Sequence, residues 1–196
     1  MNIIQQWDDC DLNWSHRKVL LESFITKYEI FDDNGHRSVH NNLLDNDFKQ
    51  FLVLFISRLF KFLMRSLKNE EDTSLLVRVL TLLVTSSNGW KCLEDISSAD
   101  ELISLKNVLE KHPETYKEEI ESVLFILENV TRYSSKISIQ IVSKPIEIIN
   151  TLVTILKISS IITMHDLVLS LLINICNHQP NEDQSEFDED MELKQI

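Results

Sequence analysis

Apolar residues recur at helical spacing along most of the chain, and polar segments separate them. Four apolar residues downstream of Ser15, a good helix-capping residue, predict a first helix that ends at about residue 28. The polar stretch over 32–47, which contains Gly35, predicts a long loop. A second helix is predicted over 47–67, before the polar segment 69–73. The first third of the chain therefore predicts two helices and a connecting loop.

From residue 74 the pattern repeats. The apolar segments 78–87, 122–131 and 167–176 resemble one another, and Val79, Val123 and Val168 hold matching places 44 and 45 residues apart. Between them a short and a medium helix are predicted twice, over 90–96 and 100–111 and then over 136–142 and 146–157. The corner before 146 contains Pro145, and Pro113 is placed at the start of the long helix that follows. Self-similarity at this period is typical of HEAT and armadillo solenoids.

The composition supports helices over sheets. The chain has 196 residues but only 2 glycines and 3 prolines, where average usage would give about 14 glycines. Sheet proteins need glycine in their turns, whereas helices satisfy their own backbone hydrogen bonds. The predicted fold class is therefore all-α, a right-handed α-solenoid of three-helix repeats.

Charge divides the chain into three parts. The formal net charge is −12, and about half of it comes from seven acidic residues after position 181, opposed only by Lys194. We expect a disordered N-terminus over 1–13, a helical domain over 14–178 with its clearest repeats over 74–178, and a disordered acidic tail over 179–196. The helical domain itself is only mildly acidic.

Residues 74–178 resemble the armadillo family. In that family the long third helix of each repeat is nearly all apolar and carries an asparagine that faces a concave groove, and Asn129 and Asn174 stand at matching places in Leu-Glu-Asn-Val and Leu-Ile-Asn-Ile. Thr85 stands there in the first unit. Where the importin-type pattern places tryptophan, this chain has Thr81, Phe125 and Ser170. The resemblance implies the fold and a peptide groove, and these departures separate it from receptors of basic localisation peptides.

The first candidate site is that groove. Asparagine is unfavourable inside a helix unless its amide makes a specific hydrogen bond, and the resemblance implies a bidentate bond to the backbone of an extended peptide. The alternative is a cap or a bond to a neighbouring repeat. The predicted groove site comprises Phe125, Asn129, Arg132 and Asn174.

The second candidate is a basic stripe on the helix predicted over 47–67 and just beyond it. Its members follow a 3-4-3 spacing that places them on one helix face: Arg58, Lys61, Arg65 and Lys68. The stripe is either the solvated side of an amphipathic helix or a binding surface for an acidic peptide, nucleic acid or an anionic membrane. The overall acidity argues against nucleic acid and membranes.

The acidic tail is a third candidate. Phe187, Met191 and Leu193 lie among acids, as in short segments that dock into basic, apolar grooves. The tail is thus a solvated extension or a ligand, and the chain's own basic stripe is one place where it can bind. Ser185, followed by acidic residues, is a candidate phosphorylation site.

Signals for catalysis are scarce. The six histidines form no helical pair with metal-binding spacing, and two isolated glycines cannot build a phosphate-binding loop. We expect no enzymatic activity, no metal and no small-molecule cofactor. Cys92 and Cys176 lie in apolar helical runs and are predicted in the core. The polar, acidic segment 2–11 is unlike a secretion signal, so the expected location is the cytoplasm or nucleus.

These expectations combine into one functional hypothesis. The chain is predicted to be a non-catalytic scaffold or adaptor that holds a peptide or helical segment of a protein partner in its groove. The alternative is an adaptor that binds nucleic acid or an anionic membrane surface through the basic stripe.

Overall fold

The computed structural model describes residues 6–8, 14–31, 37–39, 46–69, 73–85, 89–96 and 99–178. Most of these residues are helical. The helices are α2 (Trp14–Tyr28), α3 (Asn46–Lys68), α4 (Ser74–Val84), α5 (Gly89–Ile96), α6 (Ala99–Leu109), α7 (Lys117–Tyr133), α8 (Ser135–Val142), α9 (Ile149–Ile158) and α10 (Ile162–Asn177). The predicted all-helical class is therefore confirmed, with one small exception.

The exception is a two-stranded antiparallel hairpin. Strand β1 (Glu29–Phe31) pairs with β2 (Arg37–Val39), with Glu29 opposite Val39 and Phe31 opposite Arg37. Part of the predicted loop is thus extended and paired. The hairpin is tied to α4, because the guanidinium of Arg78 donates to both carboxylate oxygens of Glu29.

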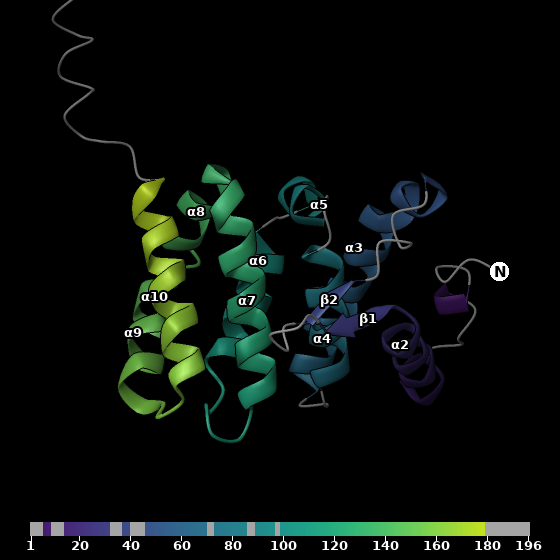
Figure 1. Cartoon of the computed structure of the whole chain (residues 1–196), viewed down its shortest axis with the longest axis horizontal. Coiled ribbons are helices and arrows are strands. Elements are labelled where there is room, and N and C mark those ends of the chain that lie inside the picture. The colour runs from purple at the N-terminus through teal and green to yellow at the C-terminus, as the bar shows by residue number, and fades with distance from the viewer. Residues whose placement is uncertain are drawn as a thin grey trace, which may run out of the picture.

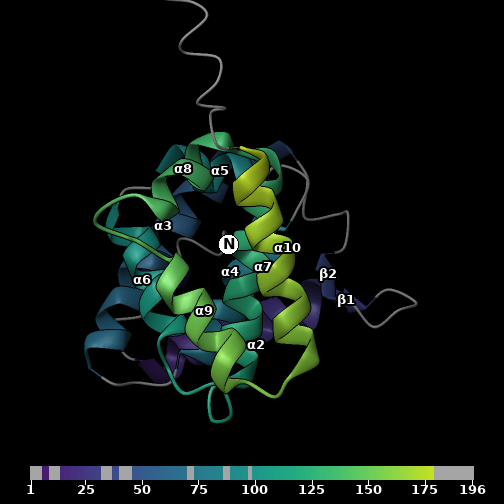
Figure 2. The same ribbon diagram turned by 90° about the vertical axis from the view of Figure 1, so that its left-hand side faces the viewer.

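The helices from α5 onward follow the order short, medium, long twice. We call α5–α7 the middle layer and α8–α10 the terminal layer. Three helices carry the matching apolar segments, namely α4, α7 and α10, and we call them the long helices although α4 has only 11 residues. They lie side by side, with the most extensive packing between α7 and α10 (Figure 1). Figure 2 looks onto the terminal layer, with α9 and α10 nearest the viewer. Helices α2 and α3 lie at the opposite end (Figure 1).

Helix α4 lies at the centre of the core. Eight of its eleven residues are buried, and they occupy all sides of the helix. A helix that is apolar all round needs neighbours on every side, and α4 has them in α2, α3, α5 and α7. Each fully buried aliphatic side chain stabilises the fold by roughly 1.5–3 kcal/mol.

The end formed by α2 and α3 is closed by aromatic side chains. Trp7 is only 3% exposed, and its ring meets those of Phe55 and Phe62 edge-on at 5.9 and 5.6 Å. Trp14 stacks on Phe62 at 5.4 Å, and the guanidinium of Arg17 lies 5.1 Å from the centre of the Trp7 ring. The packed part of the chain therefore reaches Trp7, which lies within the segment 1–13 that the sequence places outside the helical domain.

Two helices begin later than predicted. Helix α7 begins at Lys117, because residues 112–116 form turns in which the amides of Thr115 and Tyr116 donate to the carbonyl of His112. Helix α9 begins at Ile149, not at Ile146. Glu147 has a φ of 49°, a left-handed conformation that a right-handed helix does not admit. Pro145, which follows a cis peptide bond, thus lies in the corner and not in the first helical turn.

Candidate partner-binding surface

Helix α7 carries three residues of the predicted groove site. Phe125, Asn129 and Arg132 are spaced by four and three residues, so they share one side of the helix. Phe125 and Asn129 are half-buried and Arg132 is exposed, whereas most of the rest of α7 is buried. The side chain of Asn129 makes no hydrogen bond to another residue within the described part of the chain. An aromatic ring and an uncommitted amide thus lie next to each other at the surface.

Asn174 has a different environment. Its side-chain amide donates to the backbone oxygen of Glu128 at 3.0 Å and to the hydroxyl of Thr131 at 3.4 Å. Both acceptors belong to α7. Asn174 therefore ties α10 to the long helix before it, which is the bond to a neighbouring repeat that the sequence leaves as an alternative.

Glu128 is the centre of this junction. It is only 3% exposed, and its carboxylate accepts from the hydroxyl of Ser170 at 3.0 Å and from the guanidinium of Arg132 one helical turn away. The hydrogen bond to Glu128 raises the pKa of Arg132, although burial acts in the opposite direction. A buried carboxylate is costly unless it is paired. Arg132 and Ser170 therefore satisfy Glu128, and Arg132 is already engaged within the fold.

Similar pairs connect the two layers along their whole height. Five serine or threonine hydroxyls lie in the terminal layer, at the N-cap of its first helix or in the segment before α10. They donate to glutamates that precede them by 40 to 46 residues. The pairs are Ser134–Glu94, Thr151–Glu110, Ser160–Glu114, Thr163–Glu121 and Ser170–Glu128. Hydrogen bonds to an ionised acceptor are stronger than neutral ones. The hydroxyl–glutamate pairs thus hold the terminal layer in register with the middle layer.

Sequence reasoning missed these glutamates. Their only signal is a serine or threonine one repeat after a glutamate, and both residue types are too common for that spacing to stand out. Glu128 has a second signal, since it is the one charged residue in the segment 123–130, which is apolar except for Glu128 and Asn129. The family resemblance points to the neighbouring Asn129, although Glu128 is the more buried of the two.

Cys176 was predicted in the core and is exposed. It lies on the side of α10 that faces away from α7, together with Leu169 and Ile173, which are also exposed. The apolar run over 167–176 correctly predicts a helix, but no neighbour within the described residues covers this side. The side chain of Cys92 and all of Cys10 lie outside the described residues.

The basic stripe lies on α3, as predicted, but it is not a uniform basic surface. Arg58 forms a two-pronged pair with Asp8, in which Nε and Nη2 lie 2.8 Å from Oδ1 and Oδ2. Asp8 follows Trp7, so this ion pair adds to the aromatic closure of the same end. The other three members of the stripe are exposed. One of the four positive charges is thus neutralised by the chain itself.

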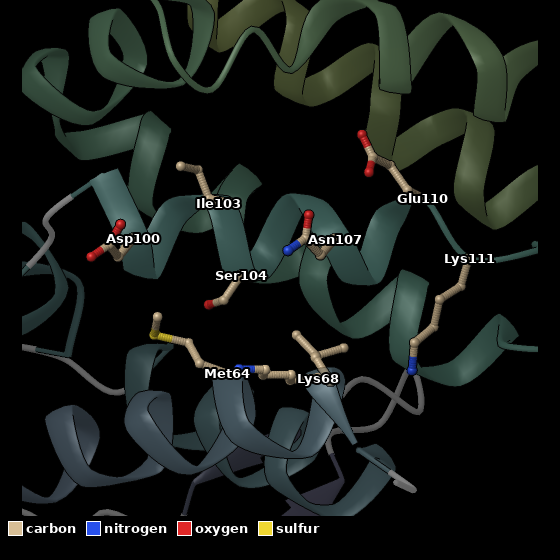
Figure 3. Close-up of a pocket in the computed structure, with 9 residues that line it drawn as sticks. Met64, Lys68, Asp100, Ile103, Ser104, Asn107, Glu110 and Lys111 are labelled. Atoms are coloured by element: carbon tan, nitrogen blue, oxygen red, sulfur yellow. The ribbon is translucent and has the colours of Figure 1, made fainter. Parts of the chain in front are cut away.

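Lys68, the last member of the stripe, lines a pocket of about 440 Å³ between α3 and α6 (Figure 3). Met64 lies on the same side, and Asp100, Glu110 and Lys111 lie across from it. The ammonium of Lys111 donates to the hydroxyl of Thr73 at 3.0 Å. Two carboxylates and two ammonium groups give this pocket no single-sign field, which phosphate binding requires.

The other features considered in the sequence are the tail, metal binding and membrane-spanning segments. Ser185 and the apolar residues of the tail lie outside the described residues. In the part of the chain that the structure describes, no three or more His, Cys, Asp or Glu side chains are grouped to hold a metal ion. None of the helices within that part is both long enough and apolar enough to cross a membrane.

Comparisons of this chain with protein families, with curated proteins and with solved structures found no match.

Proposed function

We propose that this chain is a non-catalytic protein-interaction adaptor of the cytoplasm or nucleus, built as a right-handed, armadillo-like α-solenoid. Its long helices α4, α7 and α10 would form the groove, and its ligand would be a peptide or helical segment of a partner. Two facts support the architecture. The order short, medium, long recurs, and the long helices that match at 44- and 45-residue spacings lie side by side (Figure 1).

The observation that carries the binding proposal is the pair Phe125 and Asn129. Both side chains are half-buried on the same side of α7, and the amide of Asn129 is not used by another described residue. An amide offers two donors and an acceptor, which suits the backbone of an extended chain. A neighbouring aromatic ring supplies apolar contact at low cost in conformational entropy.

The other two residues of the groove site take a supporting role in this proposal. Asn174 and Arg132 both bind Glu128, Asn174 through the backbone oxygen and Arg132 through the carboxylate. They would set the spacing of α7 and α10 beneath the ligand. We therefore assign the direct contact with a partner to Phe125 and Asn129.

The test is affinity capture from native extract with the full chain, compared with Asn129→Ala and Phe125→Ala. The matched control is Asn107→Ala, which removes an exposed asparagine that lines the pocket between α3 and α6. We expect proteins that the parent chain and the control capture to be lost from both groove variants, with unchanged melting temperatures. Identical captured proteins for all four versions would show the groove mechanism to be wrong.

The same experiment separates the alternative function. An adaptor for nucleic acid or anionic membranes would lose its partners steeply with added salt, because phosphate binding releases counterions. It would also depend on Lys61 and Arg65 and not on Asn129. The pairing of Arg58 with Asp8 and the mixed charge around Lys68 make us favour the groove.

A further inference from the structure

The terminal layer presents an exposed apolar surface. On α10, Ile162 is 74% exposed, Leu169 50% and Ile173 60%. Spacings of seven and four residues place them on one side of the helix. Asp166 lies between them on that side, and Ile139 of α8 is exposed as well. We call Ile139, Ile162, Asp166, Leu169 and Ile173 the terminal face.

The repeat shows what this surface corresponds to in the middle layer. Subtracting 45 from 139, 166, 169 and 173 gives 94, 121, 124 and 128. Glu94, Glu121 and Glu128 each accept a hydroxyl hydrogen bond from the terminal layer, and Leu124 is fully buried. Apart from Ile162, whose counterpart Lys117 is exposed, the terminal face therefore corresponds to the side of the middle layer that contacts the terminal layer.

The first long helix follows the same rule. Subtracting 44 from 121, 124 and 128 gives 77, 80 and 84, and Val77, Leu80 and Val84 of α4 are all fully buried. Helix α4 packs against α7, and α7 packs against α10. The same side is thus covered on α4 and α7 and, within the described residues, open on α10.

We propose that the terminal face is the docking site for an amphipathic helix of another protein, lying along α10 as α10 lies along α7. Thr163 meets Glu121 and Ser170 meets Glu128, so α7 and α10 run parallel, and the docked helix would take the same direction. This surface is separate from Phe125 and Asn129, and the inference does not depend on the proposed function.

Charge identifies the chemistry of the partner. Asp166 occupies the position of Glu121, which accepts the hydroxyl of Thr163. Asp166 makes no hydrogen bond or ion pair within the described residues, and a helix that covers it must supply a donor or leave a carboxylate buried without a partner. Lysine or arginine would both donate to this carboxylate and neutralise it, so the docked helix would combine an apolar side with a basic residue opposite Asp166.

Charge also decides against the two other occupants. A second copy that paired through α10 would bring no cation, because α10 contains neither lysine nor arginine. The chain's own residues 182–192 carry seven acidic side chains, which would repel Asp166. A helix from a different protein remains the occupant that fits both the apolar residues and the carboxylate.

The test uses two fluorescent 16-residue helical peptides with the same Leu and Ile stripe, differing only in a Lys or a Glu at the position opposite Asp166. Binding to the full chain is measured by anisotropy. We expect the Lys peptide to bind at least about tenfold more tightly than the Glu peptide. Asp166→Lys should reverse that preference, and Ile173→Asp should abolish binding. Val19→Asp, which changes an exposed apolar residue of α2 at the other end, should have no effect.

Three outcomes would overturn the proposal. The first is equal affinity for both peptides with no effect of Ile173→Asp. The second is a dimer in light scattering that Ile173→Asp dissociates, which would make a second copy the occupant. The third is competition by a synthetic peptide of residues 179–196, which would make the chain's own tail the occupant.

Discussion

The two ends of the row of helices differ in how their apolar side chains are covered. At the α2–α3 end, Trp7 and Trp14 cover Phe62, and Arg58 pairs with Asp8 on the outside. At the α10 end, Leu169 and Ile173 are exposed. A helix with an apolar side must bury that side against a neighbour. At the first end the chain itself buries the aromatic cluster, although Val19 and Leu54 are exposed there, and at the other end no described residue covers Leu169 and Ile173.

The chemistry of the open end differs from that of the junction inside the stack. Where the middle layer has Glu94 and Glu128, the terminal layer has Ile139 and Ile173. The inner junction is fastened by carboxylates that meet hydroxyls, which fixes the register of the layers. The open end offers apolar side chains and one carboxylate. It is therefore suited to a helix more apolar than α10.

The largest expected effect lies at the closed end. Trp7→Ala should lower the free energy of unfolding by about 3–5 kcal/mol, because it empties a buried aromatic cluster. Ile173→Ala at the open end should change it by less than about 0.5 kcal/mol. Urea denaturation followed by circular dichroism measures both. A small loss for Trp7→Ala would mean that the aromatic closure does not stabilise the fold, and the contrast between the ends would disappear.

A matched pair of leucines gives a sharper comparison. Leu124 of α7 and Leu169 of α10 are 45 residues apart, but Leu124 is fully buried and Leu169 is 50% exposed. Leu124→Ala should cost about 2–5 kcal/mol and Leu169→Ala less than about 1 kcal/mol. Comparable losses in the isolated chain would show that Leu169 is already covered in solution, for example by a second copy. Repeating the measurement at several protein concentrations would detect that case.

Substitutions at the junction between α7 and α10 should lower the free energy of unfolding by a smaller amount. Glu128→Ala should cost about 1–3 kcal/mol, because it removes charged hydrogen bonds that Ser170 and Arg132 make. A double-mutant cycle with Ser170→Ala should give a coupling energy above about 0.5 kcal/mol. Glu121→Ala is the matched control, since its bond to Thr163 is exposed and should contribute less. Additive losses for Glu128 and Ser170 would contradict the pairing.

The sequence predicts the helices of this chain better than it predicts which of their sides are buried. Helical spacing is a local property, so the order of helices and the 44- and 45-residue period follow from the positions of residues such as Val79, Val123 and Val168. Whether an apolar side is covered depends on a neighbour elsewhere in the chain. For this reason Cys176 was predicted in the core, although its side of α10 is open.

The groove site shows the same limit at the level of single side chains. Asn129 and Asn174 are equivalent in sequence, yet within the described residues only Asn174 binds the preceding long helix. Its amide reaches the backbone oxygen of Glu128 and the hydroxyl of Thr131 on α7, whereas Asn129 makes no such bond to α4 although α4 packs against α7. The segment around Trp7 is polar overall, so its composition hides the one aromatic residue that packs into the core. Both cases depend on contacts between residues that are distant in the sequence, which sequence periodicity does not encode.

The smallest expected effect concerns the ion pair on the outside of the closed end. Asp8→Asn and Arg58→Gln should each cost no more than about 1 kcal/mol, because both partners are partly exposed and solvent screens the pair. The loss should shrink as salt is raised from 0.05 to about 0.5 M, since the Debye length falls. Trp7→Ala should show no such dependence, because its contribution is apolar and aromatic. If the Asp8 variant cost as much as Trp7→Ala, the charge pair would be the feature that closes this end. The difference between the two ends would then be the presence of a salt bridge at the α2–α3 end, and not the presence of buried aromatic rings there.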